Sequence, residues 1–331
     1  MYRSQGSGVI DLTMSVIIVN RNGRDLLLNC LASLVGKAER EWHEVIVVDN
    51  GSSDGTLEAV RTEFPQVRTV EARENLGFAA ANNLGAAEAS GGLLLFLNND
   101  TVVQPGALGR LSSAFEADPQ VGIAAPSLVG PDGRDQGTMN LLMTPATVLV
   151  PGARRRAQKE LARVVARSGE LAGRAYFCGA AVMVRRSAFE SVGGFDPSFF
   201  FYCEDPDFCK RLADNGWEMA FVPDATIIHI GSASSKRIRV AADIERHRGR
   251  CRYMRKHYGF VAATAAGLVF FLTAMGQAAL NAVGLLLTLG LGRSFRRRAL
   301  LSGSACLWFL CGMPGRGRWV YRRLFGDWQK V

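Results

Sequence analysis

The stretch EVIVVDNGSSDGT (residues 44–56) decides the fold class, because it passes from an apolar run to a polar loop within a few residues. The run 45–48 consists only of β-branched residues, which favours a strand buried on both faces. Asp49 and a loop of Gly, Ser and Asp follow it directly. A buried strand that ends in such a loop is typical of a parallel sheet with a ligand at the carboxyl ends of its strands.

The same pattern repeats on both sides of this stretch. Apolar runs predict strands over residues 15–20, 67–72 and 92–101, and helical spacing predicts helices over 23–37, 56–64 and 75–90. In the first helix, Leu27, Leu31 and Leu34 fall on one face. This alternation of strands and helices predicts an α/β fold with a mostly parallel sheet flanked by helices.

Farther along the chain the pattern is less regular. The predicted elements are a solvent-exposed basic helix or a loop over 151–170, a strand over 174–186, a helix over 187–196 and a strand over 218–230. The helix should end at the two glycines of residues 193–194, because glycine readily terminates a helix.

Charge is unevenly distributed along the 331 residues. Residues 233–331 carry 18 Lys/Arg and three Asp/Glu, a net +15, whereas residues 1–232 carry 21 and 27, a net −6. A basic tail on an acidic body suggests contact with nucleic acid or with an anionic membrane leaflet. The seven cysteines show no C-x-x-C spacing, which argues against a zinc site or a disulfide framework and fits a reducing cytosol.

The tail contains an apolar segment of 34 residues (259–292) without a formal charge, flanked by basic residues. It is long enough for one membrane span, and a buried or in-plane helical hairpin is the alternative. Its basic residues alternate with long uncharged runs rather than with aromatic residues, so nucleic-acid binding is disfavoured. We therefore expect three parts: a leader (1–12), an α/β domain (13–235) and a basic, apolar helical tail associated with a membrane (236–331).

Polar residues cluster at the expected strand ends, at 20–22, 49–54 and 98–100. The first helix follows VNRNGRD rather than G-x-G-x-x-G, so the dinucleotide fingerprint is absent. Asp49 can accept a hydrogen bond from a base N–H or a ribose hydroxyl, and the glycines of the loop that follows let a ligand approach the backbone closely. The alternative is that the Ser and Asp side chains of this loop cap the next helix.

A second candidate site pairs Asp100 with His229, each of which ends an apolar strand. A carboxylate there can bind Mg²⁺ or Mn²⁺, which bridges a diphosphate, and the imidazole would be a second ligand. Against this, an Asp after a strand is often a turn residue, and a lone His often has only a structural role.

The stretch FFFYCEDPDFCKRL (199–212) ends a run of aromatic residues in two acids, Glu204 and Asp205. Pro206 suits the first position of a helix, which would make Asp205 its N-cap and explain that residue without catalysis. A carboxylate in an aromatic-lined cleft is equally suited to act as a general base. Spacing alone does not decide between the two hypotheses for Asp205, and the cap does not explain Glu204.

Six ordered motifs resemble glycosyltransferase family 2, and more narrowly its rhamnosyltransferase-like branch, over about residues 13–235. They are VIIVNRNG (16–23), VVDNGSSDGT (47–56), ENLGFAAANNLGA (74–86), LLLFLNND (93–100), the long stretch 177–217 around the two acids, and HIGSAS (229–234). The resemblance implies a GT-A fold. It also implies inverting transfer of a sugar from a nucleoside diphosphate donor in bacterial cell-surface polysaccharide synthesis.

The resemblance also implies roles for individual residues. Asp205 would be the catalytic base, Glu204 would orient the acceptor or share the proton, and Asp100 would hold Mn²⁺ or Mg²⁺ with His229 as a second ligand. The donor would be bound by residues from four of the motifs: Asn20, Asn22, Asp49, Asn50, Asn75, Gly77, Asn82 and Asn99. The aromatic residues before the acids would wall the acceptor cleft.

The implied partners are a donor such as dTDP-rhamnose or a UDP- or GDP-sugar, a lipid-linked or polysaccharide acceptor, and the cytoplasmic face of the inner membrane. Three features depart from the family pattern. Arg21 stands in the first motif where an aromatic residue is common, which bears on how the base of the donor is stacked. Asn98 replaces the first acid of the usual Asp-x-Asp, which bears on metal dependence, and no Gln-x-x-Arg-Trp follows the acids, which points to addition of one or a few sugars. The alternatives are a nucleotidyltransferase and a non-catalytic nucleotide-sugar-binding scaffold.

Overall fold

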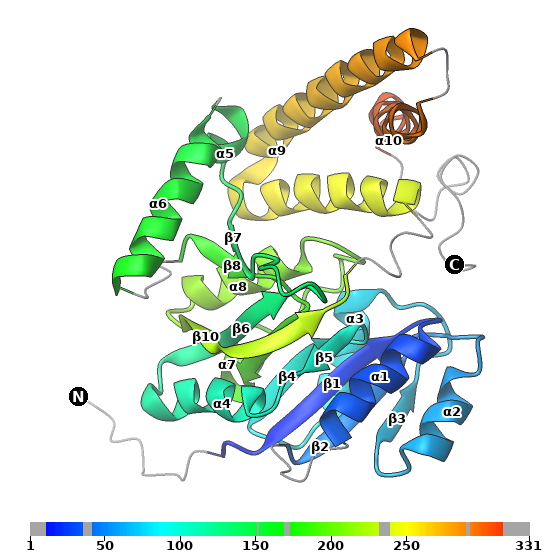
Figure 1. Ribbon diagram of the computed structural model, residues 1–331. Helices are drawn as coiled ribbons and strands as arrows, with labels where there is room; N and C mark the ends of the chain where they lie inside the picture. Colours follow the sequence, from blue (N-terminus) through cyan, green and yellow to red (C-terminus); the bar gives the residue numbers. More distant parts are fainter. Residues whose placement is uncertain are drawn as a thin grey trace.

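The computed structural model describes residues 11–35, 42–150, 152–168, 173–231, 239–288 and 292–313. Its main sheet has eight strands in the order β3-β2-β1-β4-β9-β6-β10-β5 (Figure 1). These strands are β1 (Met14–Asn20), β2 (Glu44–Asp49), β3 (Arg68–Glu71), β4 (Leu93–Asn98), β5 (Thr101–Val103), β6 (Val121–Val129), β9 (Ala181–Arg185) and β10 (Glu218–His229). A second, two-stranded sheet pairs β7 (Met139–Leu141) with β8 (Ala175–Phe177).

Ten helices are described. They are α1 (Arg24–Val35), α2 (Thr56–Glu63), α3 (Phe78–Glu88), α4 (Ala107–Ala117), α5 (Pro145–Leu149), α6 (Ala153–Ser168), α7 (Arg186–Ser191), α8 (Glu204–Asp214), α9 (Arg239–Leu287) and α10 (Arg293–Leu310). The four predicted strands and three predicted helices between residues 15 and 101 are confirmed, and α6 resolves the choice between a basic helix and a loop.

The sheet is mixed but mostly parallel, as predicted. β3, β2, β1 and β4 run parallel to one another, and β6 runs parallel to β10. β9 is antiparallel to both of its neighbours, and β5 is antiparallel to β10.

The prediction of a single strand over 174–186 is wrong, because β8 and β9 belong to different sheets. The backbone N–H of Cys178 donates to Thr138 near β7, whereas two residues later the carbonyl of Ala180 accepts from Asn98 at the end of β4. The chain therefore leaves one sheet and enters the other between these residues.

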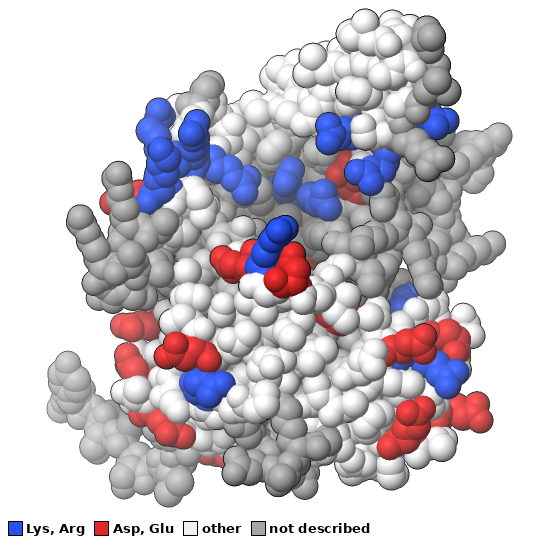
Figure 2. Space-filling model, in the orientation of Figure 1, with Lys and Arg blue, Asp and Glu red and all other residues white. Residues whose placement is uncertain are grey.

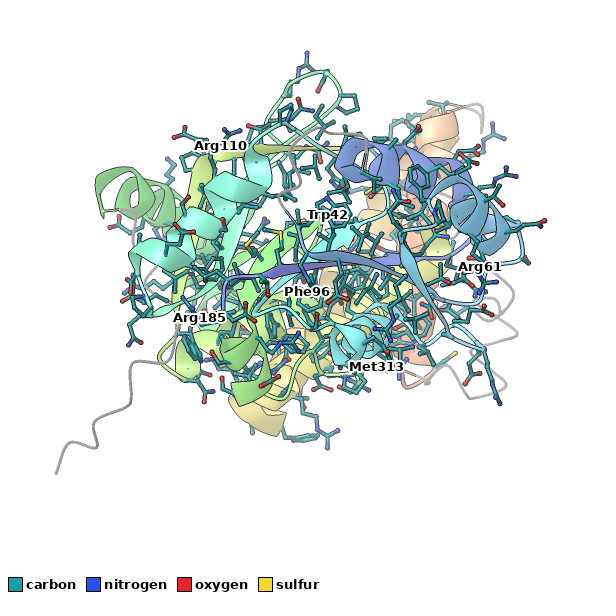
Figure 3. The ribbon with its side chains drawn as sticks, turned by 90° about the horizontal axis from the view of Figure 1, so that it is seen from below. Trp42, Arg61, Phe96, Arg110, Arg185 and Met313 are labelled. Atoms are coloured by element: carbon teal, nitrogen blue, oxygen red, sulfur yellow. The ribbon has the colours of Figure 1, made fainter. Side chains whose placement is uncertain are left out.

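Both faces of the main sheet are buried, which explains why its strands are continuous apolar runs. Val16 and Ile18 pack on one face with α1 and α4, whereas Ile17 between them packs on the opposite face with α3, α7 and α8. Phe96 of β4 belongs to the second face and lies near the middle of the molecule, with Arg61 and Arg110 toward its periphery (Figure 3).

The strand register brings the polar clusters together. Asn20 of β1 is opposite Asp49 of β2, and on the other side of β1 Val19 is opposite Asn98 of β4. Because these strands are parallel, their carboxyl ends meet at one edge of the sheet, as predicted.

In the part of the chain that the structure describes, the tail forms the helices α9 and α10. The first segment of α9 packs on the α/β domain, and its second segment, the apolar arm (residues 260–287), extends away from the domain (Figure 1). α9 bends at Gly259, where φ is 81°. Before the bend, Tyr253 and Met254 are buried against Phe199 of the domain. After it, Val261, Leu280 and most other large apolar side chains are exposed, and α10 packs alongside.

Within the described residues, one helix is long and apolar enough to cross a membrane by length and composition, namely Val240–Leu287. Only 11% of the apolar 18-residue stretch within this helix is buried, whereas the core helix of a soluble protein is mostly buried. Most of the predicted leader (1–10) and the predicted boundary at 235–236 lie outside the described residues.

Candidate active site

Asp49 ends β2 at the edge where the polar clusters meet, and its side chain is buried, with 3% of the residue exposed. Its Oδ2 accepts a hydrogen bond from the Ser52 backbone N–H at 3.0 Å. Its Oδ1 is buried and has no hydrogen-bond partner among the described residues. A buried carboxylate oxygen without a partner fits a ligand that brings an N–H or O–H donor, as a nucleoside does.

The asparagines of the first motif join neighbouring loops. Asn20 accepts from Asn99 Nδ2 at 2.5 Å and donates to Ser52 Oγ and Thr56 Oγ1 at 3.4 and 3.3 Å. Asn22, held at φ 48°, accepts from the Ser53 backbone N–H at 2.8 Å. These bonds tie the end of β1 to the loop after Asp49, so both asparagines fix the shape of this loop.

A second set of bonds fixes the loop before α3. Asn50 donates to Asn75 Oδ1 at 3.1 Å and accepts from the Leu76 backbone N–H at 2.8 Å. Arg21 donates through Nη1 to the carbonyls of Asn50 and Gly51, at 2.8 Å each. Asn50 and Asn75 thus hold the backbone before α3 in place, and Arg21 fixes the neighbouring loop at residues 50–51.

Gly77 connects this loop to the segment before the two acids. A Cβ at Gly77 would lie 2.4 Å from the Phe200 ring, and φ here is 85°. The backbone N–H of Phe78 donates to the Phe200 carbonyl at 2.7 Å. Asn82 is buried one turn further on and donates to the Phe78 carbonyl at 3.0 Å. Only glycine therefore lets the N-terminus of α3 approach the aromatic segment so closely.

Asp100 and His229 meet across the pair of β5 and β10, as the metal-site hypothesis requires. Asp100 Oδ1 lies 3.4 Å from His229 Nε2, and both side chains are largely buried. On the other side of the imidazole, Nδ1 lies 2.8 Å from Gln136 Oε1. Gln136 Nε2 donates to the His229 carbonyl, so its Oε1 accepts from Nδ1–H, and Nε2 is the ring nitrogen that faces Asp100.

This pair fits a divalent cation that completes its coordination elsewhere. Among the described residues no group of three His, Cys, Asp or Glu side chains is placed to hold a metal. Mg²⁺ and Mn²⁺ are commonly held by one or two protein ligands, with substrate phosphates and water in the remaining positions. Asp100 and His229 are two candidate ligands of this kind.

The helix that carries the two acids begins earlier than predicted. α8 starts at Glu204, and its N-cap is Cys203, whose side chain makes no capping bond. Both Tyr202 and Cys203 have φ of 71°, a conformation that turns the chain sharply into the helix. The interpretation of Asp205 as the N-cap is therefore wrong, because Asp205 already lies inside the first turn.

The two acids share an apolar, low-dielectric environment. Burial raises the pKa of Asp205 to about 7, while the nearby backbone amide of Gly179 opposes the shift. Burial and then the charge of Asp205 raise the pKa of Glu204 well above its ordinary value. Glu204 Oε2 has no hydrogen-bond partner among the described residues. Near neutral pH the pair therefore holds a proton readily, and Asp205 is the member poised to exchange it.

Two residues of the aromatic run that was expected to wall the acceptor cleft are covered by the tail helices. Phe199 and Phe200 are buried, the first against Tyr253 of α9 and the second against α9 and Trp308 of α10. They are the contact through which the tail helices hold the segment before the acids. Phe201 and Tyr202 are half-buried and line a small pocket together with α9, so the role of the run as a wall of the acceptor cleft stays a prediction.

Comparison with known proteins identifies the family. The family model described as glycosyl transferase family 2 matches residues 15–193, more than half of the chain. The chain belongs to glycosyltransferase family 2. The model for glycosyl transferase family 21 matches residues 155–305.

Two curated relatives illustrate this membership. The chain is 31% identical over 246 residues to an N-acetylglucosaminyl-diphospho-decaprenol L-rhamnosyltransferase of Mycobacterium tuberculosis, covering 68% of this chain and 78% of that protein. It is 29% identical to the O-antigen biosynthesis protein RfbC of Myxococcus xanthus, covering 67% of this chain and 18% of that protein. The protein is thus a glycosyltransferase enzyme similar to a rhamnosyltransferase.

Solved structures confirm the GT-A-like fold of this family 2 enzyme. The mannosyltransferase PcManGT from Pyrobaculum calidifontis, in complex with GDP-Man and Mn²⁺, matches with a TM-score of 0.53 at 20% identity, covering 94% of this chain and 92% of that one. GalNAc-T7 with UDP, GalNAc and Mn²⁺ matches with a TM-score of 0.50 at 19% identity, covering 66% and 43%.

Sequence reasoning missed Gln136 and did not anticipate the position of Arg21. Gln136 lies in an irregular segment 93 residues before His229, and no spacing rule connects the two. Arg21 stood out only as an unusual residue for its motif. Its guanidinium lies near Asp49, whose charge partly offsets the lowering of the Arg21 pKa by burial.

Proposed function

We propose that this family 2 glycosyltransferase moves one sugar, with inversion, from a nucleoside diphosphate donor to a hydroxyl of a lipid-linked acceptor at the membrane surface. The observation that carries the proposal is the state of Asp205. It makes no cap, it lies on the first turn of α8, and its pKa is raised to about 7. A carboxylate with a pKa near neutrality is suited to accept a proton from a hydroxyl during attack.

The donor would bind at the sheet edge around Asp49. Its unpaired Oδ1 would accept from the base or the ribose, within the loop that Asn20 and Asn22 hold in shape. The diphosphate would lie near the N-terminus of α3, because the positive end of a helix dipole favours an anion. Asn50, Asn75, Asn82 and Asn99 act here by positioning loops, because their side chains already bond to the protein.

Asp100 and His229 would hold the divalent metal, Mn²⁺ or Mg²⁺. When bound, the cation supplies positive charge that stabilises the departing diphosphate. Gln136 keeps the imidazole in the tautomer that presents Nε2. Asn98 adds no charge, so the binding of the metal would depend strongly on the phosphates of the donor.

The acceptor hydroxyl would attack the anomeric carbon on the face opposite the leaving group. Asp205 takes the hydroxyl proton as the new carbon–oxygen bond forms and the bond to the diphosphate breaks. Glu204, whose pKa is well above its ordinary value, remains protonated and can donate a hydrogen bond to the acceptor. One displacement of this kind inverts the configuration at the anomeric carbon.

The choice of rhamnose and of a lipid-linked acceptor rests on the relative in Mycobacterium tuberculosis, whose name states both. The exposed apolar arm of α9 supports a location at the membrane, on the cytoplasmic face where nucleotide sugars are made. A three-part division into leader, GT-A domain (13–235) and membrane-associated tail (236–331) is part of the proposal.

The test is a donor panel with the purified full-length enzyme. dTDP-rhamnose, UDP-hexoses and GDP-mannose are compared for binding and slow hydrolysis, with and without Mn²⁺, in the wild type, Asp205→Asn and Asp100→Ala. We expect one donor to bind in a metal-dependent way, Asp205→Asn to bind it without turnover, and Asp100→Ala to lose the metal response. Binding of a donor without any turnover by the wild type would instead support a non-catalytic scaffold.

A further inference from the structure

α9 contacts the residue that directly precedes the two acids. A Cβ built at Gly249 would lie 2.7 Å from the Tyr202 carbonyl oxygen and 3.1 Å from Cys203 Sγ. The absence of a side chain at Gly249 therefore lets the helix touch the sharply turned segment that leads into Glu204. The tail helix thus forms part of the surroundings of the active site.

Two arginines lie on this face of α9. Arg246 and Arg250 are three residues before and one residue after Gly249, and they are separated by one helical turn. The Arg246 guanidinium lies 4.8 Å from the centre of the Tyr202 ring. The Arg250 guanidinium lies 5.8 Å from the centre of the ring of Phe270, which belongs to the apolar arm after the bend. The pair therefore lies between the segment leading into the acids and the apolar arm.

A third arginine, Arg154 of α6, is exposed, and its charge acts on Arg250. Burial lowers the pKa of Arg250, and the neighbouring positive charges of Arg246 and Arg154 lower it further. Arg154 also acts on Tyr176, which in turn lies near Asp205. In the space-filling view, Lys and Arg side chains form a band along the junction between the α/β domain and the tail helices (Figure 2).

This cluster carries more positive charge than its neighbours neutralise. Arg246 pairs with Asp243 at 3.1 Å, but neither Arg154 nor Arg250 forms an ion pair with any residue in the described part of the chain. Arg154 is exposed and the Arg246 side chain is 41% exposed, whereas Arg250 is half-buried, so an anion can reach these guanidinium groups. A bound anion would reduce the repulsion between the like charges. Phosphate groups are the anions that arginine binds best, through paired hydrogen bonds.

We propose that Arg154, Arg246 and Arg250 bind the phosphates of the acceptor, namely the diphosphate that joins its sugar to its lipid. This proposal rests on the proposed function and deepens it, because it specifies a lipid diphosphate acceptor rather than a polymer. The order of the groups along the molecule agrees with it. The sugar of the acceptor would lie at the acids, its diphosphate at the arginines, and its lipid along the exposed apolar side chains of α9.

The experiment compares full-length wild type with Arg246→Gln/Arg250→Gln, with Arg255→Gln on an exposed face of the same helix as the matched control. Binding of farnesyl diphosphate and of farnesol is measured in EDTA, without any transfer. We expect the double variant to lose about tenfold or more in affinity for farnesyl diphosphate and to bind farnesol unchanged. The unchanged affinity for farnesol also shows that the variant is folded. Equal affinity of wild type and double variant for farnesyl diphosphate would overturn the proposal.

Transfer kinetics separate the possible sources of phosphate. For N-acetylglucosaminyl diphosphofarnesol we expect the KM of the double variant to rise about tenfold or more, with the donor KM and the KM for the neutral farnesyl glycoside unchanged. A rise in the donor KM would assign the arginines to the donor, and loss of binding to phosphatidylglycerol vesicles would assign them to the bilayer. Either result would overturn the proposal. If the wild type transfers no sugar to either acceptor but its farnesyl diphosphate binding depends on the arginines, the proposed function fails and the phosphate site stands.

Discussion

At the residue scale, the two neighbouring acids of α8 differ in how far their side chains are exposed. Glu204 is buried, whereas Asp205 is partly exposed and lies beside Gly179. Burial raises both pKa values, and the pKa of Asp205 rises to about 7. Asp205 is therefore the acid that can both reach a substrate and change its protonation state near neutral pH.

The first prediction concerns the pH dependence of activity. Below its raised pKa Asp205 is protonated and cannot act as a base, so kcat/KM should fall about tenfold per pH unit on the acid side of about pH 7. Asp205→Asn should lower kcat by about 10²–10⁴-fold and keep donor binding. Initial rates between pH 5 and pH 9 check this. An unchanged rate at pH 5.5 would exclude Asp205 as the base.

The raised pKa of Asp205 also predicts that stability falls as the pH rises, whereas activity rises with pH. The pKa of Asp205 is higher in the folded state than its ordinary value of 3.8, so the free energy of unfolding falls as the pH rises from 3.8 to about 7, and the full cost is present above that. Asparagine does not ionise. Asp205→Asn should therefore raise Tm by about 2–4 °C at pH 8 and leave it unchanged near pH 4. Thermal unfolding at both pH values checks this, and a lower Tm at pH 8 would contradict it.

Gln136 is the second residue whose role can be tested separately. Gln136→Leu removes the acceptor for His229 Nδ1–H, so the imidazole loses its fixed tautomer and orientation. We expect the affinity for Mn²⁺ in the presence of a nucleoside diphosphate to fall about 10–100-fold. Titration of Mn²⁺ followed by electron paramagnetic resonance measures this. Gln120→Leu, at an exposed glutamine before β6, is the control, and equal affinities of the two variants would refute the assignment.

At the element scale, α8 and α9 are joined by a buried ionic cluster as well as by apolar contacts. Asp207 of α8 has no exposed side-chain surface, and it bonds to Arg211, Lys256 and His257. Burial alone would raise the pKa of Asp207, but its bonds to His257, Lys256 and Arg211 lower the pKa below its ordinary value. Lys256 also pairs with Asp196, so the end of the first segment of α9 is tied to both sides of the acids.

Two glycines of α9 provide a matched pair for testing this contact. A Cβ at Gly249 would lie 2.7 Å from the Tyr202 carbonyl oxygen, whereas a Cβ at Gly276 would have no atom within 4 Å. Alanine normally stabilises a helix relative to glycine, so Gly276→Ala should be neutral or stabilising by up to about 1 kcal/mol. Gly249→Ala should instead destabilise the protein by about 1–3 kcal/mol and lower kcat, because it displaces the helix from the acids. Chemical denaturation of the two variants decides, and similar free energies of unfolding would contradict the close contact.

At the scale of the whole molecule, the tail has two parts with different roles. The segment of α9 before Gly259 belongs to the folded core, since it buries Ile244, Tyr253 and Met254. The arm after Gly259 leaves Leu280 and Leu286 73% and 76% exposed. Removal of residues 236–331 would therefore uncover the core as well as remove the arm, so substitutions within the arm are the sharper test.

The prediction for the arm is loss of membrane binding without loss of catalysis. Each apolar side chain that enters the bilayer contributes about 1.5–3 kcal/mol, and a carboxylate at the same position opposes entry. Leu280→Glu/Leu286→Glu should release the enzyme from anionic vesicles in a flotation assay and leave hydrolysis of the donor unchanged. Ala117→Glu on α4 is the control. Retention of the double variant on vesicles would show that the arm does not anchor the protein.

How much was predictable from the sequence follows from the range of the interactions involved. Local apolar patterns predicted the strands and helices through residue 101. The rule for parallel sheets predicted that Asp49 and Asp100 lie at the same edge of the sheet, and the family motifs predicted the pairing of Asp100 with His229. These features depend on neighbours in sequence or on a topology that many sequences share.

Other features were decided only by the tertiary structure. The start of α8 at Glu204, the burial of Phe199 and Phe200 under the tail, and the contact of Gly249 with Cys203 depend on which surfaces pack together. The same holds for Gln136 behind His229 and for Arg246 beside Tyr202, since the side chains in contact come from distant parts of the chain. The amino-acid sequence determined the family, the sheet and the presence of the two acids, whereas long-range packing determined how far each acid is exposed and which helices cover the segment before them.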